Sequence, residues 1–296
     1  MTVEAPVQFD RMALDDAGAN PEKLADAIHR QLGERPGPVP ILEIAKALDI
    51  TEIREEALVG MEGALVTNVE RGFGSIVVNS QSSQFRQRFT VGHELGHFLN
   101  PYHQPTVASG FECTRSDMLA ASLTGTTSRH QRQEVEANRF AIELLTPRRR
   151  LTPYLSPEPD LSHALRLAAD FEISRAAACR RYVALHDATL AVVFSRKGQV
   201  DYIDRSREFP FIPLRHGGPM PPLPAVSGFM SRSTMESVDA SDWIGQAQPA
   251  QLSAQTLYQQ DGYEMTLLLI EADEDGDDGE EPEDAFDRFS RYNGTP

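Results

Sequence analysis

The chain has 296 residues, a formal net charge of −16 and 40% hydrophobic residues. This length suits one large domain or two ordinary ones, and the apolar fraction is enough to build a buried core. No run of about 18 apolar residues is present, which argues against a transmembrane helix, and the N-terminus lacks the basic and apolar segments of a secretory signal. We therefore expect a cytoplasmic protein.

The two cysteines, Cys113 and Cys179, are far apart and have neither metal-site nor redox spacing. Two such cysteines do not make a disulfide framework, which agrees with a reducing compartment. The helical surroundings of Cys179 predict a small packing residue. Cys113 lies in a polar segment and is predicted to be a free loop thiol, with a regulatory thiol as the alternative.

The N-terminal part of the chain begins with a leader and then takes on helical periodicity. Residues 1–19 are expected to form a flexible leader. Asn20 followed by Pro21 and Glu22 is typical of a helix N-terminus, and apolar residues at helical spacing follow. A second, short helix is expected over residues 41–48.

In the next part, the spacing of apolar residues changes from helical to strand-like and back to helical. Within residues 63–79, the segments 64–66 and 75–79 predict two strands joined by a polar, Gly-containing connection. Residues 84–99 return to helical spacing and are followed by Asn-Pro, which ends a helix. Residues 101–127 are rich in Pro, Ser, Thr and Gly and predict a long loop with one short helix at most; a loop of that length inside a domain is usually functional.

The second half of the chain starts helical and ends with strand-like segments. Ser128 is a candidate cap for a helix that continues to about Leu145. Asp160 and Ser174 are candidate caps of two further helices joined by a tight turn. From Thr189 onward the pattern is typical of β-strands. The expected strands are 189–195, 199–203, 254–260 and 264–271.

The negative charge is concentrated near the C-terminus. Ten acidic residues and no basic residue lie between Glu271 and Asp284. An acidic, Gly-containing segment that is poor in apolar residues is expected to be solvated and disordered. Solubility is its simplest role, and docking of a basic partner is the alternative. The acidic balance also disfavours nucleic acid as a direct ligand of the whole molecule.

The sharpest feature is the sequence His-Glu-Leu-Gly-His at residues 93–97, inside the predicted helix 84–99. His93 and His97 are four positions apart and share one helix face, where two imidazoles can bind one metal ion. In zinc peptidases with this motif, the glutamate at the position of Glu94 reaches the metal-bound water and takes its proton. The alternative is a pair of surface histidines beside a carboxylate.

A catalytic zinc needs a third protein ligand and one open position. The predicted helix 128–145 supplies the candidates. Glu134 and Asn138 share a face of this helix, so Glu134 is the predicted third ligand. Glu136 lies nearly opposite Asn138 and stays as the alternative ligand, and a solvated helix carboxylate is the simplest interpretation of each. Manganese or iron could fill the same donor set as zinc.

Two segments carry a resemblance to a known family. Residues 86–99, Arg-Gln-Arg-Phe-Thr-Val-Gly-His-Glu-Leu-Gly-His-Phe-Leu, resemble the active-site helix of the ImmA/IrrE family of metallopeptidases. Residues 134–147, Glu-Val-Glu-Ala-Asn-Arg-Phe-Ala-Ile-Glu-Leu-Leu-Thr-Pro, resemble its second motif, and residues 76–80 match the strand before the active-site helix. Together the matches cover about residues 40–147. Thr146 departs from the family, which more often has Met at this packing position.

The resemblance implies a zincin-like fold with His93, His97 and Glu134 as metal ligands and Glu94 as the catalytic residue. Family members of known role cleave a helix-turn-helix repressor of the XRE type, and so switch on genes under stress or in mobile elements. The resemblance implies the same class of protein substrate here. An antitoxin is an alternative substrate.

We therefore predict an α+β protein in four parts. A flexible leader (1–19) precedes a zincin-like metallopeptidase domain that includes a helical hairpin (20–188). A mainly β C-terminal domain (189–271) follows, and a disordered acidic tail (272–296) ends the chain. Members of the IrrE type carry a sensor-like C-terminal domain, so the resemblance implies a regulatory role for the β domain. Trp243, the only tryptophan, is expected to anchor its core.

A second class of protein remains open. Residues 165–178 resemble a helix-turn-helix, in which Arg175, Arg180 and Arg181 could contact DNA phosphates. A packed helical hairpin is the simpler interpretation. The competing hypothesis is a DNA-binding transcriptional regulator with a structural or vestigial metal site. The complete His-Glu-x-x-His sequence favours the peptidase, because a structural site does not need Glu94.

Several other polar residues lie close to the motifs in sequence. A stabiliser of the transition state could come from His103, Tyr102, His130 or Tyr154, but each is expected to be a loop or surface residue and none is assigned. The basic run at residues 148–150 is expected to be a solvated face, with steering of an acidic substrate segment as the alternative.

Overall fold

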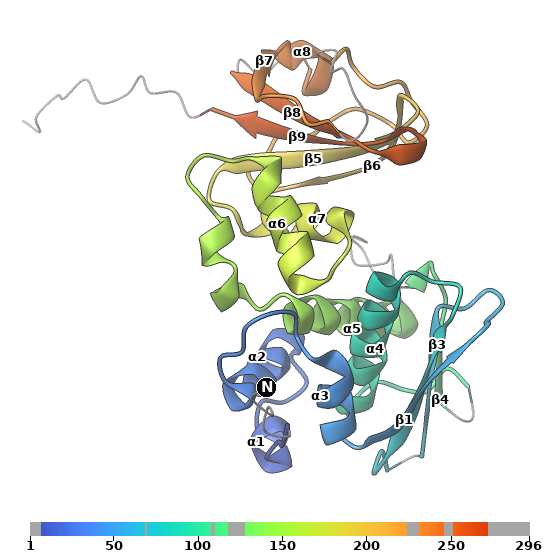
Figure 1. The fold of residues 1–296 in the computed structure, drawn as a ribbon. Helices are drawn as coiled ribbons and strands as arrows, with labels where there is room; N and C mark the ends of the chain where they lie inside the picture. The colour runs from blue at the N-terminus through green and yellow to red at the C-terminus, as the bar shows by residue number, and fades with distance from the viewer. Residues whose placement is uncertain are drawn as a thin grey trace, which may run out of the picture.

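The computed structural model describes residues 7–68, 70–107, 110–117, 128–223, 231–245 and 251–271. Over these residues the chain is a mixed α+β protein with eight α-helices and two sheets (Figure 1). The N-terminal helices lie against the first sheet, a pair of helices follows, and the second sheet covers the far side of that pair (Figure 1). The predicted acidic tail, 272–296, lies outside the described residues.

The N-terminal part combines five helices with a four-stranded sheet of order β1-β3-β2-β4, in which only the β1–β3 pair is parallel. Helix α4 lies between this sheet and helix α5, and α2 packs on the other side of α5. The elements are α1 (Arg11–Asp15), α2 (Pro21–Leu32), α3 (Ile41–Ala47), β1 (Ile50–Glu56), β2 (Gly63–Thr67), β3 (Gly74–Asn79), α4 (Gln84–Leu99), β4 (Gly110–Cys113) and α5 (Arg129–Leu145).

Local sequence explains where the two central helices begin. The Ser83 side chain accepts a hydrogen bond from the backbone N–H of Arg86 at the start of α4. Ser128 and Gln131 form a reciprocal capping box at the start of α5. The predicted helices at both places are therefore confirmed, and so is the predicted hairpin of β2 and β3.

Three expectations are corrected in this part. Residues Arg11–Asp15 of the expected leader form helix α1, because Leu14 reaches the core and is only 2% exposed. Strand β1 was not predicted, since its exposed polar residues outnumber the buried ones. The expected long loop contains strand β4, which pairs with β2 and ends at a buried Cys113.

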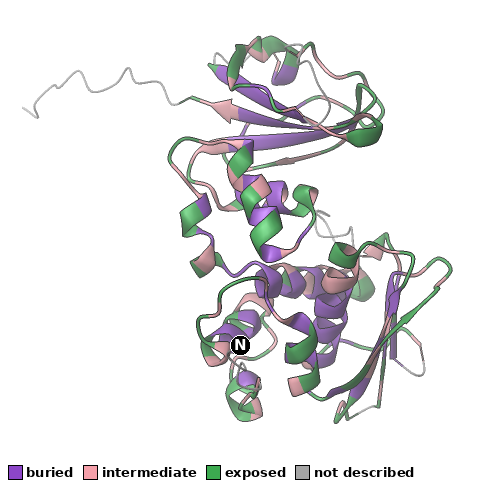
Figure 2. Cartoon of the chain, in the orientation of Figure 1, coloured by how far each residue is buried: buried purple, intermediate pink, exposed green. Residues whose placement is uncertain are grey.

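Small residues allow α4 and α5 to approach each other closely. A Cβ atom added at Gly96 would lie 3.0 Å from a Phe140 ring carbon and 3.3 Å from the Ala137 Cα atom. One added at Gly92 would lie 3.3 Å from the Ala141 Cβ atom. Both helices are buried along this contact (Figure 2). The backbones of the two helices therefore meet with almost no side chain between them.

The C-terminal part is a helical pair and a five-stranded antiparallel sheet of order β6-β5-β9-β8-β7. One face of the sheet packs on the helical pair, where the buried Cys179 confirms the predicted packing role. The other face packs on Trp243, which is the predicted core anchor. The elements are α6 (Leu161–Phe171), α7 (Arg175–Leu185), β5 (Thr189–Arg196), β6 (Gln199–Arg205), β7 (Glu236–Val238), α8 (Ala240–Trp243), β8 (Leu252–Tyr258) and β9 (Tyr263–Ile270).

In the described ranges, no helix combines the length and the apolarity that crossing a membrane requires.

The arginines of the helix-turn-helix-like segment have partners within the protein. Arg181 is buried and donates two hydrogen bonds to the Glu143 carboxylate, at 2.8 and 2.6 Å, and a third to the Thr146 carbonyl. Arg180 pairs with Asp204, and Arg175 donates to the Gln259 side chain. The structure thus favours the packed hairpin, which ties α7 to α5.

The buried ion pair gives a test of this packing. In Arg181→Met the Glu143 carboxylate stays buried without its partner, so the free energy of unfolding should fall by roughly 3–5 kcal/mol. Urea unfolding measures this change. Arg175→Met, on the exposed side of the same helix, is the matched control and should change stability by about 0.5 kcal/mol at most. Equal effects of the two substitutions would contradict a role for Arg181 in holding the hairpin.

Candidate metal centre

Three secondary-structure elements bring four potential metal ligands together. Helix α4 contributes His93 and His97, strand β4 contributes Cys113, and helix α5 contributes Glu134. One ligand atom from each residue lies within 4.8 Å of all the others, and all four side chains are buried. The Nε2 atoms of the two histidines are 3.1 Å apart. The Glu134 carboxylate lies 3.1 Å from the His93 Nε2 atom and 3.4 Å from the His97 Nε2 atom.

The spacing of these atoms fits a divalent metal ion. A tetrahedral zinc with ligand bonds of roughly 2.0–2.3 Å holds its ligand atoms about 3.3–3.7 Å apart, close to the separations between the two imidazoles and the carboxylate. Both Glu134 oxygens are buried, and neither has a hydrogen-bond partner. Buried carboxylates are costly unless they are paired or bind a metal. The donor set therefore fits the metal that the sequence motif predicts.

Glu94 follows His93 on α4 and is completely buried beside the four ligands. Neither of its carboxylate oxygens has a hydrogen-bond partner. Burial raises the pKa of Glu94 to about 7, and the neighbouring His93 opposes this shift. Strand β2 passes directly over this side chain, and a Cβ atom added at Gly63 would lie 3.1 Å from a Glu94 oxygen. Glu94 is therefore a buried carboxylate whose pKa suits proton exchange near neutral pH.

The hydrogen bond between Asn138 and His93 fixes which His93 nitrogen faces the ligand group. The Asn138 amide nitrogen donates to the Asp117 carbonyl at 2.9 Å, so its oxygen is free to accept. That oxygen lies 2.9 Å from the His93 Nδ1 atom, which therefore carries the proton. The lone pair of the His93 Nε2 atom is left for a metal, the usual orientation of a histidine ligand.

A longer chain of hydrogen bonds orients His97. The His103 Nε2 atom lies 3.0 Å from the Glu136 carboxylate and 2.9 Å from the Asn100 amide nitrogen; when it donates to the carboxylate, the His103 Nδ1 atom is an acceptor. The His97 Nδ1 atom, 2.9 Å away, donates to it, so the Nε2 atom of His97 also points its lone pair at the ligand group. Arg71 holds the connecting segment by donating to the His97, Asn100 and His103 carbonyls.

Glu136 points away from the ligand group, as helical geometry predicts, whereas His103 has a place that differs from the one expected. Glu136, the alternative third ligand, points to His103 rather than to the group that contains Glu134. His103 is not a surface residue, because only 1% of it is exposed. The hydrogen bonds to His97 and Glu136 explain why a polar ring can be buried there.

The pKa values of the two histidines and of Glu134 are shifted from those of solvated side chains. Burial lowers the pKa of His97 to about 3, so this imidazole is neutral. Burial also acts to lower the pKa of His93, but the Glu134 and Glu94 carboxylates outweigh it and raise that pKa. Burial alone would raise the pKa of Glu134, yet the two imidazoles hold it well below its usual range. An ionised carboxylate and a neutral imidazole are the forms that bind metals.

The other residues considered as stabilisers of the transition state lie at different distances from the four potential metal ligands. The His130 Nδ1 atom is 3.5 Å from Glu134, and its Nε2 atom is 3.3 Å from Asp117, so this half-exposed ring lies at the edge of the site. Tyr102 is exposed, and Tyr154 donates to Asp170 beside α6 instead.

Cys113 is the member of the group that the sequence analysis missed. It was assigned to a loop, whereas it is the buried end of strand β4. The alternation of buried Phe111, exposed Glu112 and buried Cys113 is a strand pattern that could have indicated this. Its spacing from the other ligands gives no signal, because the pairing of β4 with β2 is what brings it to the site.

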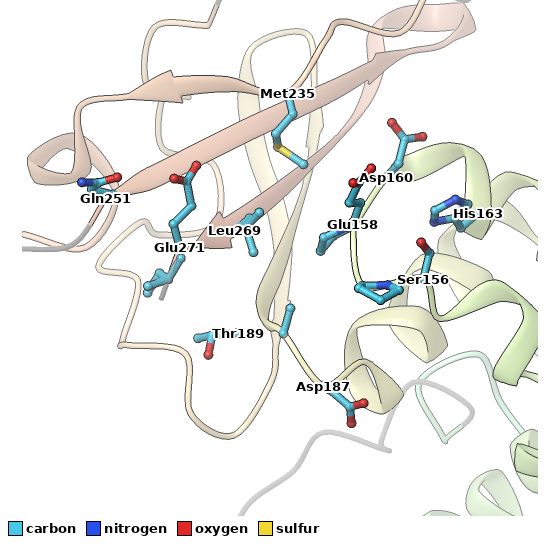
Figure 3. Close-up of a pocket in the computed structure, with 14 residues that line it drawn as sticks. Ser156, Glu158, Asp160, His163, Asp187, Thr189, Met235, Gln251, Leu269 and Glu271 are labelled. Atoms are coloured by element: carbon cyan, nitrogen blue, oxygen red, sulfur yellow. The ribbon is translucent and has the colours of Figure 1, made fainter. Parts of the chain in front are cut away.

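A large pocket lies elsewhere in the molecule. Its volume is about 1370 Å³, and it lies between the segment leading into α6 and the edge of the second sheet (Figure 3). Glu158, Asp160, His163 and Glu271 are among the residues around it. None of the four potential metal ligands lines this pocket, so its contents would not touch the metal.

The structure thus shows an α+β domain with a buried group of four side chains that could hold a metal ion. Residues 45–182 match the family model described as Peptidase_M78: IrrE N-terminal-like domain. This match covers the residues that carry the sequence resemblance and supports an ImmA/IrrE-type metallopeptidase domain in this region. A search of curated proteins finds no match. A solved structure described as a Mycobacterium tuberculosis transcriptional regulator is similar at 12% identity and a TM-score of 0.48, over 84% of this chain and 87% of that one.

The hydrogen bond to His93 predicts a measurable effect on metal affinity. In Asn138→Leu the His93 ring loses its acceptor, so the dissociation constant for zinc should rise by roughly 10–100-fold. Competition with a chromophoric chelator measures it. Arg139→Leu, at the exposed neighbouring position on α5, should bind zinc as the wild type does. Equal zinc affinity in Asn138→Leu and wild type would show that the hydrogen bond to Asn138 is not needed to orient the His93 ring for zinc binding.

Proposed function

We propose that the protein is a zinc-dependent endopeptidase in which His93, His97 and Glu134 hold the metal and Glu94 is the catalytic base. The observation that carries the proposal is the position of Glu94. This carboxylate is buried beside the ligand group and has no hydrogen-bond partner. A site that only stabilises the fold gains nothing from such a group, because a buried carboxylate without a partner is destabilising.

A bound zinc ion would supply the Lewis acid that polarises the scissile carbonyl and makes water a nucleophile at neutral pH. The residues of the chain then have separate tasks. Glu94 takes a proton from the attacking water at a carboxylate oxygen and passes it to the leaving amine. The His103–Glu136 and Asn138 hydrogen bonds keep the two histidines in the tautomer that binds metal. Burial acts to raise the pKa of Glu94, which favours its holding the proton before the transfer to the amine.

The substrate that we propose is a helix-turn-helix repressor of the XRE type, whose cleavage would derepress genes in a stress response. The family resemblance supports this substrate, and an antitoxin is the alternative protein substrate. We place the peptidase in the cytoplasm, where such repressors act. We further propose that residues 20–188 form the catalytic domain and that 189–271 form a regulatory domain. The pocket of Figure 3 lies where these two parts meet.

A second candidate function has one observation in its favour. Cys113 lies at the place of a fourth ligand, and a site with four protein ligands is typical of structural zinc. A DNA-binding regulator with a structural metal would have such a site. Against it, Arg175, Arg180 and Arg181 of the helix-turn-helix-like segment are engaged within the protein. Specific binding of duplex DNA at physiological salt in a gel-shift assay would favour this second function.

The substitution Glu94→Gln separates the two functions. It removes the base and leaves the ligands, so bound zinc should be retained while cleavage of an XRE-type helix-turn-helix repressor falls by roughly 10²–10⁴-fold. Gel electrophoresis of timed digests measures the cleavage, and metal analysis measures the zinc. Glu112→Gln removes an exposed carboxylate close to the site and should cleave normally. Wild-type cleavage by Glu94→Gln would refute the proposed mechanism.

A further inference from the structure

We propose that Cys113 is a fourth ligand of the metal, so that the resting protein holds its metal in a closed and latent site. The ligand assignment stands on the geometry alone. The latency rests on the peptidase function proposed above. A catalytic zinc keeps one position open for water or substrate, and in this arrangement a thiolate fills that position.

The position of the sulfur supports the assignment. The Cys113 Sγ atom lies 3.2 Å from the His93 Nε2 atom, and it is within 4.8 Å of the ligand atoms of His97 and Glu134 as well. The side chain is completely buried. The 3.2 Å separation of sulfur and nitrogen is close to the spacing of two ligand atoms around one tetrahedral zinc ion, which is about 3.3–3.7 Å. The thiol thus faces the two imidazoles and the carboxylate rather than solvent.

Strand β4 holds Cys113 in place. Cys113 pairs with Gly63 of β2, and its carbonyl accepts a hydrogen bond from the Glu62 backbone N–H at 3.0 Å. Two residues earlier, the Phe111 ring stacks on His97 with centroids 4.5 Å apart. Buried side chains of one short strand therefore contact the face of α4 that carries the two histidines. The pairing of β4 with β2 fixes the position of the sulfur atom.

The donor set that results is chemically consistent with zinc. Two imidazoles, a thiolate and a carboxylate are all common zinc ligands, and a thiolate disfavours manganese and magnesium, which prefer oxygen donors. Binding would release the proton of the Cys113 thiol and form one sulfur–metal bond. The proposal therefore favours zinc over manganese, one of the alternatives that the sequence left open.

The geometry also indicates how the site could open. β4 is an edge strand whose strand partner among the described residues is β2, although its first residue, Gly110, also bridges to Val107; Cys113 is its last residue. Separation of this end would break the sulfur–metal bond, return a proton to the thiol and leave one metal position for substrate and water. The Glu94 carboxylate lies against the Cys113 thiol and therefore beside that position. Only the end of one strand would have to move to convert the latent site into an active one.

Cobalt substitution tests the ligand assignment on the full-length protein. Co²⁺ bound to a thiolate gives a charge-transfer band in the near ultraviolet, which nitrogen and oxygen ligands do not give. The wild type should show this band, Cys113→Ser should lose it, and Cys179→Ser should keep it. Cys179 is the matched control because it is the other buried cysteine and lies in a different core. Cys113→Ser should also raise the dissociation constant for Co²⁺ by roughly tenfold or more, the scale found even for groups that only orient ligands.

Cleavage of an XRE-type helix-turn-helix repressor by the zinc-loaded proteins tests the latency. Cys113→Ser and Cys113→Ala should both cleave faster than wild type at saturating zinc, and circular dichroism shows whether each variant is folded. A wild-type cobalt form without the band, or a folded Cys113→Ala that keeps it, overturns the ligand assignment and leaves the peptidase proposal intact. A wild type with the band that cleaves as fast as both variants overturns the latency. If the band is present and none of the three proteins cleaves, the ligand assignment holds and the peptidase proposal fails.

Discussion

The close approach of α4 and α5 is the constraint on which the rest of the structure depends. Gly92 and Gly96 face Ala137 and Ala141, and added side chains at the glycines would press on α5. These small residues alternate along α4 with the two histidines, so the same contact that joins the helices places both imidazoles against Glu134. Helices separated by larger side chains would leave the carboxylate out of reach, because interaxial distance follows side-chain size.

The burial of the polar groups around this contact is favourable only if these groups interact with one another or with a shared ion. Two imidazoles and two carboxylates without solvent would be unfavourable as separate groups. Asn138 and the His103–Glu136 pair direct both imidazole lone pairs toward one point, and the unpartnered Glu134 oxygens face the same point. A divalent ion there satisfies all of them at once. The Glu94 oxygens are the exception, which is why this residue and not another carries the proposed chemistry.

Local signals in the sequence predicted the helices and the residues that they bring together. The cap at Ser128 and the spacing of His93 and His97 are properties of neighbouring residues, and they can be read without a fold. The choice of Glu134 over Glu136 also followed from helical geometry. Cys113 and His103 were missed because their burial depends on contacts between distant segments: β4 must pair with β2, and His103 must meet Glu136 of α5. Strand β1 was missed because its polar residues carry no alternation of apolar character.

The central claim is that one divalent ion lies between α4 and α5. Anomalous scattering at the zinc edge from crystals of the zinc-loaded protein tests it most directly. The account predicts a single strong peak within roughly 2.0–2.3 Å of ligand atoms from His93, His97 and Glu134. A peak elsewhere, or a Glu134 carboxylate turned away from a metal bound by the histidines, would contradict it.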